Sequence, residues 1–302
     1  MSSAAPQVTI ILPTYNWSAV LPFSIASALG QSFQDFELIV VGDGCTDDSA
    51  EVVASIGDPR VQWVNLAANA GHQSGPNNEG LRRARGALVA YLGHDDLWLP
   101  HHLACLVAAV DSGADMAFGF VRMVPAEPKL QRAALAERYL PGMWIAPTAT
   151  VHRRALTERL GGWRSYRDLA VDPETELWSR FHAAGARIAP VKRLTAVKFP
   201  AAARRGVYRE RPSHEQAAWL ARIRGEPALE AVELARAASE MATAAREQPF
   251  RTLVGQVLRR GTRGMARRLG WREARREPGE AVTRRRALKG LEPIPNMPGE
   301  PG

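Results

Sequence analysis

Two adjacent aspartates, Asp95 and Asp96, lie two residues beyond an apolar run at 87–92. The run predicts a buried strand, so both carboxylates lie beyond its carboxyl end, the edge at which open α/β sheets bind ligands. Adjacent carboxylates repel each other, and a divalent cation that also bridges phosphate oxygens removes that repulsion. The pattern therefore indicates a metal site, although Asp-Asp pairs are equally typical of solvated turns.

The elements that must position these carboxylates alternate between strand and helix patterns through the first half of the chain. Apolar and β-branched runs predict strands at 8–12, 36–41, 61–66 and 87–92. Amphipathic patterns between them predict helices at 18–29, 47–56 and 78–85. Strands that alternate with short helices are typical of an α/β fold with a mostly parallel sheet and helices on both faces.

The second half is less regular and becomes helical towards its end. Its patterns predict helices at 101–111 and 174–184 and strands at 116–123 and 188–198. Beyond His214 the sequence is helical in pattern and rich in Ala, Arg and Glu, and 290–302 is rich in Pro and Gly, which predicts disorder. We therefore divide the chain into a main domain at 1–215, a basic helical extension at 216–289 and a disordered tail at 290–302.

The composition favours a folded protein from a reducing compartment. Of the 302 residues, 46% are apolar, which is enough for a core. The two cysteines, Cys45 and Cys105, are too few for a disulfide framework. The first apolar run, 8–12, ends at Pro13 and is too short for a signal peptide or a membrane span. We expect a cytoplasmic protein, with peripheral attachment to the inner face of a membrane as an alternative.

The net charge of +8 belongs to the C-terminal extension. Residues 251–290 carry 13 Lys and Arg against 3 Glu, so the rest of the chain is slightly acidic, which argues against nucleic acid as a partner of the main domain. Apolar residues at helical spacing between 250 and 271 alternate with arginines. Such a helix is typical of binding to an anionic membrane surface, and equally of packing on the main domain.

Short motifs follow the predicted strands in a definite order. They are Leu12-Pro13-Thr14-Tyr15-Asn16, Val41-Gly42-Asp43-Gly44-Cys45-Thr46-Asp47, Asn69-Ala70-Gly71, Asn78-Glu79-Gly80-Leu81, Gly93-His94-Asp95-Asp96, Gly161-Gly162-Trp163 and Glu174-Thr175-Glu176-Leu177-Trp178-Ser179-Arg180. Through this series, residues 8 to about 200 resemble glycosyltransferase family 2. The resemblance implies an inverting enzyme with the GT-A fold, whose Rossmann-like, mostly parallel sheet is flanked by helices.

The resemblance implies that a nucleotide-sugar, most often UDP-linked, binds beyond the first strands. Pro13, Thr14 and Tyr15 would contact the base or the ribose. Asp43 would accept a hydrogen bond from the nucleobase, while Gly42 replaces the first aspartate of the family's usual pair. Aspartate is also a common turn residue, and Asp43 can serve both purposes.

The resemblance also assigns roles to the aspartate pair. Asp96 would be the metal ligand, and Asp95 would hold the ribose or a metal-bound water. The ion would be Mn²⁺ or Mg²⁺, hard cations that proteins bind through one or two carboxylates plus substrate phosphates. Its charge would stabilise the departing diphosphate.

A carboxylate must also activate the acceptor hydroxyl. When the sequence is aligned to the family motif on Trp178 and Arg180, Glu174 falls at the general-base position. Asp172, two residues earlier, is the alternative base. Pro173 suits the first turn of a helix with Asp172 as the N-cap, which gives Asp172 a structural role and favours Glu174 as the base.

Three further residues are candidate acceptor or loop contacts: Trp163, Trp178 and His214. Core packing is as good an explanation for the tryptophans. The acceptor itself is a carbohydrate, a glycolipid or a small hydroxyl compound. Two other functions stay open. One is a nucleotidyltransferase, although the Gly-rich basic loop typical of that class is missing after the first strand. The other is a non-catalytic sugar- or lipid-binding protein: the presence of Asp43, Asp96 and Glu174 argues against it, while Gly42 and the shifted Asp172-Pro173-Glu174 segment keep it open.

Overall fold

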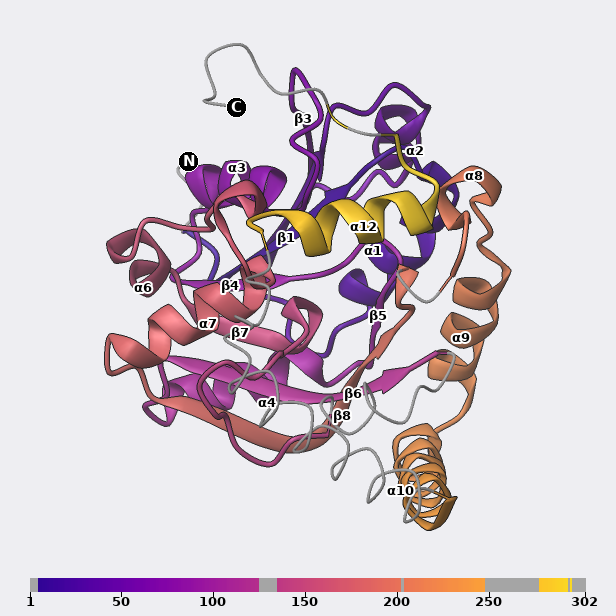
Figure 1. Ribbon diagram of the computed structural model, residues 1–302. Coiled ribbons are helices and arrows are strands. Elements are labelled where there is room, and N and C mark those ends of the chain that lie inside the picture. Colours follow the sequence, from indigo (N-terminus) through magenta and orange to yellow (C-terminus); the bar gives the residue numbers. More distant parts are fainter. Residues whose placement is uncertain (1–4, 125–134, 202–203, 248–276, 293, 295–302) are drawn as a thin grey trace, which may run out of the picture.

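The computed structural model describes residues 5–124, 135–201, 204–247, 277–292 and 294. These residues form an α/β structure around one sheet of eight strands in the order β3-β2-β1-β4-β7-β6-β8-β5 (Figure 1). The strands are β1 (Val8–Thr14), β2 (Phe36–Gly42), β3 (Val61–Asn65), β4 (Leu88–Tyr91), β5 (Leu97–Trp98), β6 (Met116–Met123), β7 (Thr150–Arg153) and β8 (Ile188–Lys198). The predicted α/β class is confirmed.

Helices cover the sheet and close its edges (Figure 1). The α-helices are α1 (Leu21–Leu29), α2 (Ser49–Ser55), α3 (Ser74–Arg83), α4 (His102–Asp111), α6 (Arg154–Arg159), α7 (Pro173–Ala183), α8 (Val207–Glu210), α9 (His214–Gly225), α10 (Leu229–Glu247) and α12 (Glu280–Lys289). Short 3₁₀ turns are η1 (Ser18–Val20), η2 (Pro147–Ala149) and η3 (Tyr166–Asp168).

The first four strands of the sheet are parallel, and this places three strand ends together. β1 pairs with β2 on one side and β4 on the other, and Thr14 at the end of β1 lies opposite Gly42 at the end of β2. β7 is antiparallel to both β4 and β6, while β6 and β8 run parallel. The predicted parallel sheet is therefore found in its first half. β5 has only two residues, and β7, Thr-Val-His-Arg, lacks the run of apolar residues that marks β4.

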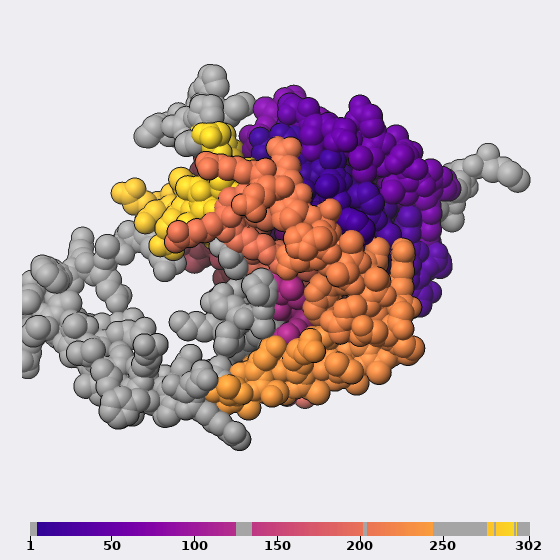
Figure 2. Space-filling model, turned by 90° about the vertical axis from the view of Figure 1, so that its right-hand side faces the viewer, coloured from indigo at the N-terminus to yellow at the C-terminus, as the bar shows by residue number. Residues whose placement is uncertain are grey.

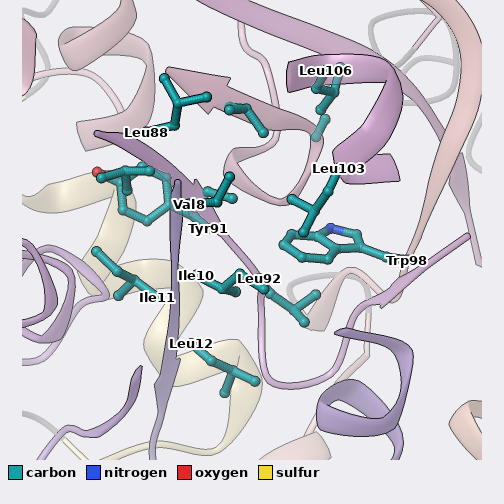
Figure 3. Close-up of a cluster of buried hydrophobic side chains, with 14 of the residues drawn as sticks. Val8, Ile10, Ile11, Leu12, Leu88, Tyr91, Leu92, Trp98, Leu103 and Leu106 are labelled. Carbon is teal, nitrogen blue, oxygen red and sulfur yellow. The ribbon is translucent and has the colours of Figure 1, made fainter. Parts of the chain in front are cut away.

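The core lies on both faces of the central strands. Val8, Ile10, Ile11 and Leu12 of β1 are fully buried, in a cluster that includes Trp98 (Figure 3). Consecutive apolar residues, rather than alternating ones, are what a parallel strand covered on both faces requires. This buried platform fixes the positions of the strand ends.

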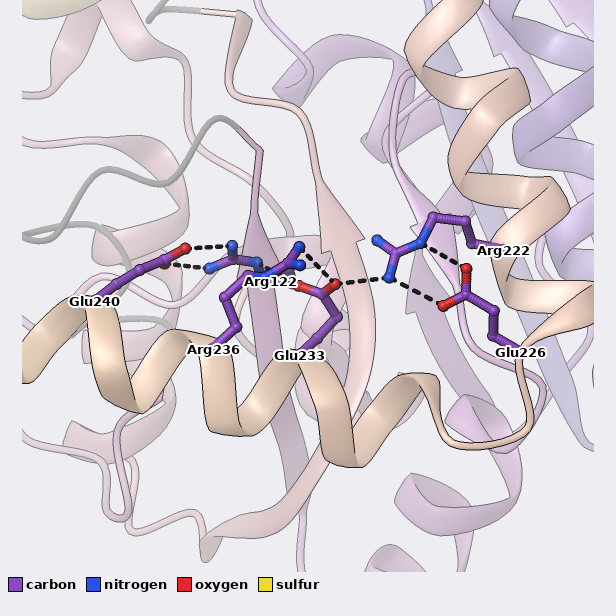
Figure 4. A network of polar contacts seen from close by, with 6 residues as sticks. All are labelled: Arg122, Arg222, Glu226, Glu233, Arg236 and Glu240. Atoms are coloured by element: carbon purple, nitrogen blue, oxygen red, sulfur yellow. Dashed lines mark hydrogen bonds and ion pairs between the residues drawn. The ribbon is translucent and has the colours of Figure 1, made fainter.

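A buried ion-pair network attaches α10 to the sheet. The Arg122 guanidinium on β6 lies 2.9 Å from Glu233 and 2.5 Å from Glu240, both on α10 (Figure 4). Arg222 on α9 contacts the same Glu233 at 2.9 Å. The predicted domain boundary at 215 falls inside α9, and α9 and α10 both pack on the main domain. The predicted amphipathic stretch at 250–271 lies outside the described residues.

Helix α12 crosses above the carboxyl ends of the strands and lies beside α8 (Figure 1 and Figure 2). A backbone hydrogen bond fixes each end: Gly279 N–H donates to the Leu169 carbonyl at 2.9 Å, and Gly206 N–H donates to the Leu288 carbonyl at 3.0 Å. Gly279 and Gly290, which flank the helix, both have positive φ angles, 77° and 81°, that favour glycine.

Candidate active site

A cavity of about 480 Å³ lies between the ends of β1, β2 and β4 and the overlying α12. Its volume is in the range of small-molecule sites. Carboxylates and cations line it in equal number. The carboxylates are Asp43, Asp95, Asp172 and Glu174, and the cations are Lys198, Arg285, Arg286 and Lys289.

Asp43 occupies the end of the cavity formed by β1 and β2. It follows β2 directly, and its Oδ1 accepts a hydrogen bond of 2.7 Å from the Ala70 N–H. Burial raises the pKa of Asp43 to about 6, although that hydrogen bond opposes the shift. Pro13, Thr14 and Tyr15 line the same cavity. The structure therefore brings the predicted base and ribose contacts together.

The two adjacent aspartates have different surroundings. Asp96 is fully buried, and its Oδ2 lies 2.8 Å from the Lys198 ammonium while Oδ1 accepts the Phe199 N–H at 3.1 Å. Asp95 lines the cavity and Asp96 does not. Burial raises the pKa of both, with Lys198 opposing the shift in each case. The carboxylate that the sequence analysis assigned to the metal is thus already engaged by a lysine and a backbone N–H.

The arrangement limits how a metal ion can be held. Within the described part of the chain, no three His, Cys, Asp or Glu side chains gather around a possible metal position. Asp95 is the member of the pair that faces the cavity. A single carboxylate fits a divalent cation of the kind that draws its remaining ligands from water and substrate phosphates.

Glu174 and Asp172, the rival bases, also differ in what binds them. Glu174 lies in the first turn of α7, is 6% exposed, and its Oε1 accepts a hydrogen bond of 2.9 Å from the Trp144 indole N–H. Its Oε2 has no hydrogen-bond partner among the described residues. The Asp172 carboxylate is bound by the Arg285 guanidinium of α12. Glu174 therefore keeps an oxygen free to accept a proton.

His94 is held on both ring nitrogens. Nδ1 lies 2.9 Å from the Thr14 hydroxyl, and Nε2 lies 3.1 Å from the Tyr208 hydroxyl. Burial lowers the pKa of His94 to about 4, so it is neutral at pH 7. This histidine ties β1 to the aspartate loop and to α8, which agrees with a structural role.

The three expected acceptor contacts do not line the cavity. Trp163 and Trp178 are buried in the core, where the Trp163 indole donates to the Tyr91 hydroxyl at 2.9 Å and the Trp178 indole donates to the Ile145 carbonyl at 3.1 Å. His214 is the exposed first residue of α9. Aromatic residues in the core find partners for their polar atoms there, as these two do.

The basic side of the cavity was not predicted from the sequence. Lys198 ends the predicted strand at 188–198, so the rule that strand ends carry functional side chains would have selected it. Arg285, Arg286 and Lys289 were counted only as charge in the extension. Burial lowers the pKa of Lys289 to about 8, and the Asp95 charge opposes that shift.

Comparisons with known proteins identify the family. The family model described as glycosyl transferase family 2 matches residues 9–172. The chain is 34% identical over 119 residues to GalNAc(5)-diNAcBac-PP-undecaprenol beta-1,3-glucosyltransferase of Campylobacter jejuni, a match that covers 38% of each chain. The chain thus spans well under half the length of this curated relative.

Two solved structures share the fold. S. aureus TarS in complex with UDP gives a TM-score of 0.55 at 20% identity, covering 72% of this chain and 64% of TarS. The mannosyltransferase PcManGT from Pyrobaculum calidifontis, in complex with GDP-Man and Mn²⁺, gives 0.56 at 21% identity and covers 83% and 84%. The predicted GT-A fold is confirmed by these neighbours. Because the family model covers more than half of the 302 residues, the chain belongs to glycosyl transferase family 2.

Proposed function

We propose that this protein is an inverting glycosyltransferase that transfers a sugar from a nucleotide-sugar to an acceptor hydroxyl. The observation that carries the proposal is a single cavity in which Asp43, Asp95 and Glu174 come together from three separate segments. Their roles are base recognition, diphosphate binding through a metal, and proton abstraction. Family membership supports the same activity.

The donor is proposed to be a UDP-sugar. The Asp43 carboxylate accepts a base N–H, and Pro13, Thr14 and Tyr15 contact the base or ribose. TarS in complex with UDP supports this choice, while PcManGT in complex with GDP-Man makes a guanine nucleotide the alternative. The ionised carboxylate accepts this hydrogen bond more strongly than the neutral acid does, and the Asp43 pKa of about 6 leaves the group mostly ionised at neutral pH.

Asp95, rather than Asp96, is proposed to hold a divalent metal, Mn²⁺ or Mg²⁺, together with the donor phosphates. This revises the sequence-based assignment, because both Asp96 oxygens already have partners in Lys198 and Phe199. When bound, such an ion supplies Lewis-acid stabilisation of the charge on the departing diphosphate. The Mn²⁺ in the PcManGT complex, a structure with the same fold, supports this proposal.

Glu174 is proposed as the general base. The acceptor oxygen attacks the anomeric carbon, its proton passes to the free Oε2 of Glu174, and the bond between the anomeric carbon and the diphosphate oxygen breaks. Trp144 holds the other carboxylate oxygen and so orients the acid-base group. Attack opposite the leaving group in one step inverts the configuration. Asp172 is the weaker candidate because Arg285 occupies its carboxylate.

The acceptor class is proposed as a lipid-linked sugar, because the C. jejuni relative is named for an undecaprenol-linked substrate. A carbohydrate or a small hydroxyl compound is the alternative. The helices in the described part of the chain include none with the length and hydropathy of a membrane span. We keep the proposal that the basic stretch at 250–271 binds an anionic membrane surface from the cytoplasmic side.

The proposed function is tested by thermal unfolding of the protein with a panel of nucleoside diphosphates, with and without Mn²⁺. A ligand that binds the native state alone raises the unfolding temperature. We expect UDP with Mn²⁺ to give the largest shift. A larger shift with GDP would correct the donor, and the absence of any shift across the panel would contradict the enzymatic function.

A further inference from the structure

Helix α12 turns its charged face into the cavity. We call residues 279–290, which contain α12, the strap. Val282, Arg285, Arg286 and Lys289 line the cavity, and their spacing of three, four and seven residues places them on one face of a helix. Arg284 on the same helix is exposed and does not line the cavity. The basic residues of the strap thus divide into an inward set and an outward one.

The strap is fixed at several points around the cavity. Val282 is 6% exposed, and the ends are held by the Gly279–Leu169 and Leu288–Gly206 backbone hydrogen bonds. Between them, Arg285 binds Asp172, and Arg286 donates to the Gly71 carbonyl at 2.7 Å. Arginines that hold backbone and carboxylate oxygens in this way orient the helix.

Lys289 differs from these two arginines in lacking such a partner. Among the described residues, its ammonium makes no hydrogen bond or ion pair, and it lies 5.9 Å from the centre of the Tyr208 ring. Its side chain is half-buried and lines the same cavity as Asp95 and Lys198. A cation removed from water without a counter-ion is unfavourable, so the position favours an anionic ligand.

We propose that Lys289 of the strap binds the diphosphate of the nucleotide-sugar donor, so that α12 completes the donor site from above. The inference rests on the proposed function, since it assigns a further contact to the same ligand. Asp95 lies on the sheet side of the cavity and Lys289 on the α12 side. A cation there stabilises the negative charge that develops on the leaving diphosphate.

The test compares Lys289→Met with Arg284→Met in the full-length protein. Methionine keeps the aliphatic stem and removes the charge, and Arg284 is the matched control on the outward face of the same helix. Calorimetry measures UDP affinity at constant Mn²⁺, and ligand-observed NMR measures uridine affinity. We expect Lys289→Met to weaken UDP binding about tenfold, the loss of one charge-assisted contact, with uridine affinity unchanged. Arg284→Met should leave both affinities unchanged.

A second substitution separates charge from packing. Lys289→Arg keeps the cation and should retain UDP affinity within about threefold, while thermal unfolding of all three variants shows whether the fold is kept. UDP affinity in Lys289→Met that is equal to that of the wild type would overturn the inference. A higher affinity would also overturn it, and would indicate that the strap blocks the site. Wild-type protein that binds neither UDP nor GDP would contradict the proposed function itself, and this inference with it.

Discussion

The floor and the roof of the cavity differ in charge and in construction. The floor consists of the ends of β1, β2 and β4, and carries Asp43 and Asp95 on a sheet whose core is fully buried. The roof is the strap, which carries Arg285, Arg286 and Lys289 and is held by backbone hydrogen bonds and an ion pair. The floor is therefore set by strand register, whereas the roof is positioned by its own hydrogen bonds and ion pair.

This difference suggests a division of labour. Groups on a packed sheet are rigid, which suits recognition of a nucleotide and alignment of a reacting carbon. Groups on a helix held by separate hydrogen bonds and one ion pair add positive charge to the site without setting the positions of the strand ends. The two candidate bases at the start of α7 differ in the same way. Arg285 of the strap binds Asp172, whereas Oε2 of Glu174 has no hydrogen-bond partner among the described residues.

The largest expected effect is a loss of transfer rate on substitution of Glu174, the proposed general base. Glu174→Gln keeps the acceptor for the Trp144 indole but cannot take a proton, so the transfer rate should fall about 10³-fold while UDP affinity stays within about twofold. Asp172→Asn should lower the rate less than about tenfold, because the Asp172 carboxylate binds Arg285 of the strap rather than the acceptor. Initial rates and calorimetry measure both quantities. A near-normal rate in Glu174→Gln would move the base role to Asp172.

Asp95 and Asp96 should respond differently to substitution, because Asp96 pairs with Lys198 and Asp95 faces the cavity. Asp96→Asn removes the charge that balances the half-buried Lys198 ammonium, and should lower the free energy of unfolding by about 2 kcal/mol. Asp95→Asn should leave stability nearly unchanged and remove the part of UDP affinity that depends on Mn²⁺. Urea unfolding and calorimetry check the two outcomes. The reverse pattern would restore the sequence-based assignment of Asp96 to the metal.

A smaller effect on UDP affinity is expected from a change in pH, through the Asp43 carboxylate at the end of β2. The pKa of Asp43 is about 6, so the carboxylate takes up a proton as the pH falls through 6 and its hydrogen bond to the base N–H loses the contribution of the negative charge. UDP affinity should then fall by up to about tenfold and level off at lower pH, the loss of one charge-assisted contact. In Asp43→Asn, which has no such titration, this part of the pH dependence should be absent. An identical pH profile in the variant would show that Asp43 does not accept the base.

The sequence predicted the floor well because its signals are local. The apolar runs at 8–12 and 87–92 end where β1 and β4 end, within two residues, and the side chains that follow them do line the cavity. Strands 116–123 and 188–198 match β6 and β8 in full. Once a strand end is located in the sequence, its place in the fold follows, because parallel strands bring their carboxyl ends to one edge of the sheet.

The roof could not be predicted in the same way. The Arg285–Asp172 contact joins residues 113 apart, and no short motif marks it. The Asp96–Lys198 pair spans 102 residues, so the sequence could not tell which aspartate of the pair faced the cavity. Trp163 shows a related limit, since an aromatic residue after two glycines gives the same pattern in a core and on a sugar platform.

A structure of the protein with UDP and Mn²⁺ tests the central claim most directly, that floor and roof form one donor site. We expect the base beside Asp43, the diphosphate between Asp95 and Lys289, and Oε2 of Glu174 open towards the acceptor side. A nucleotide bound outside this cavity, or one bound within it with α12 expelled and the Lys289 ammonium in solvent, would contradict the account.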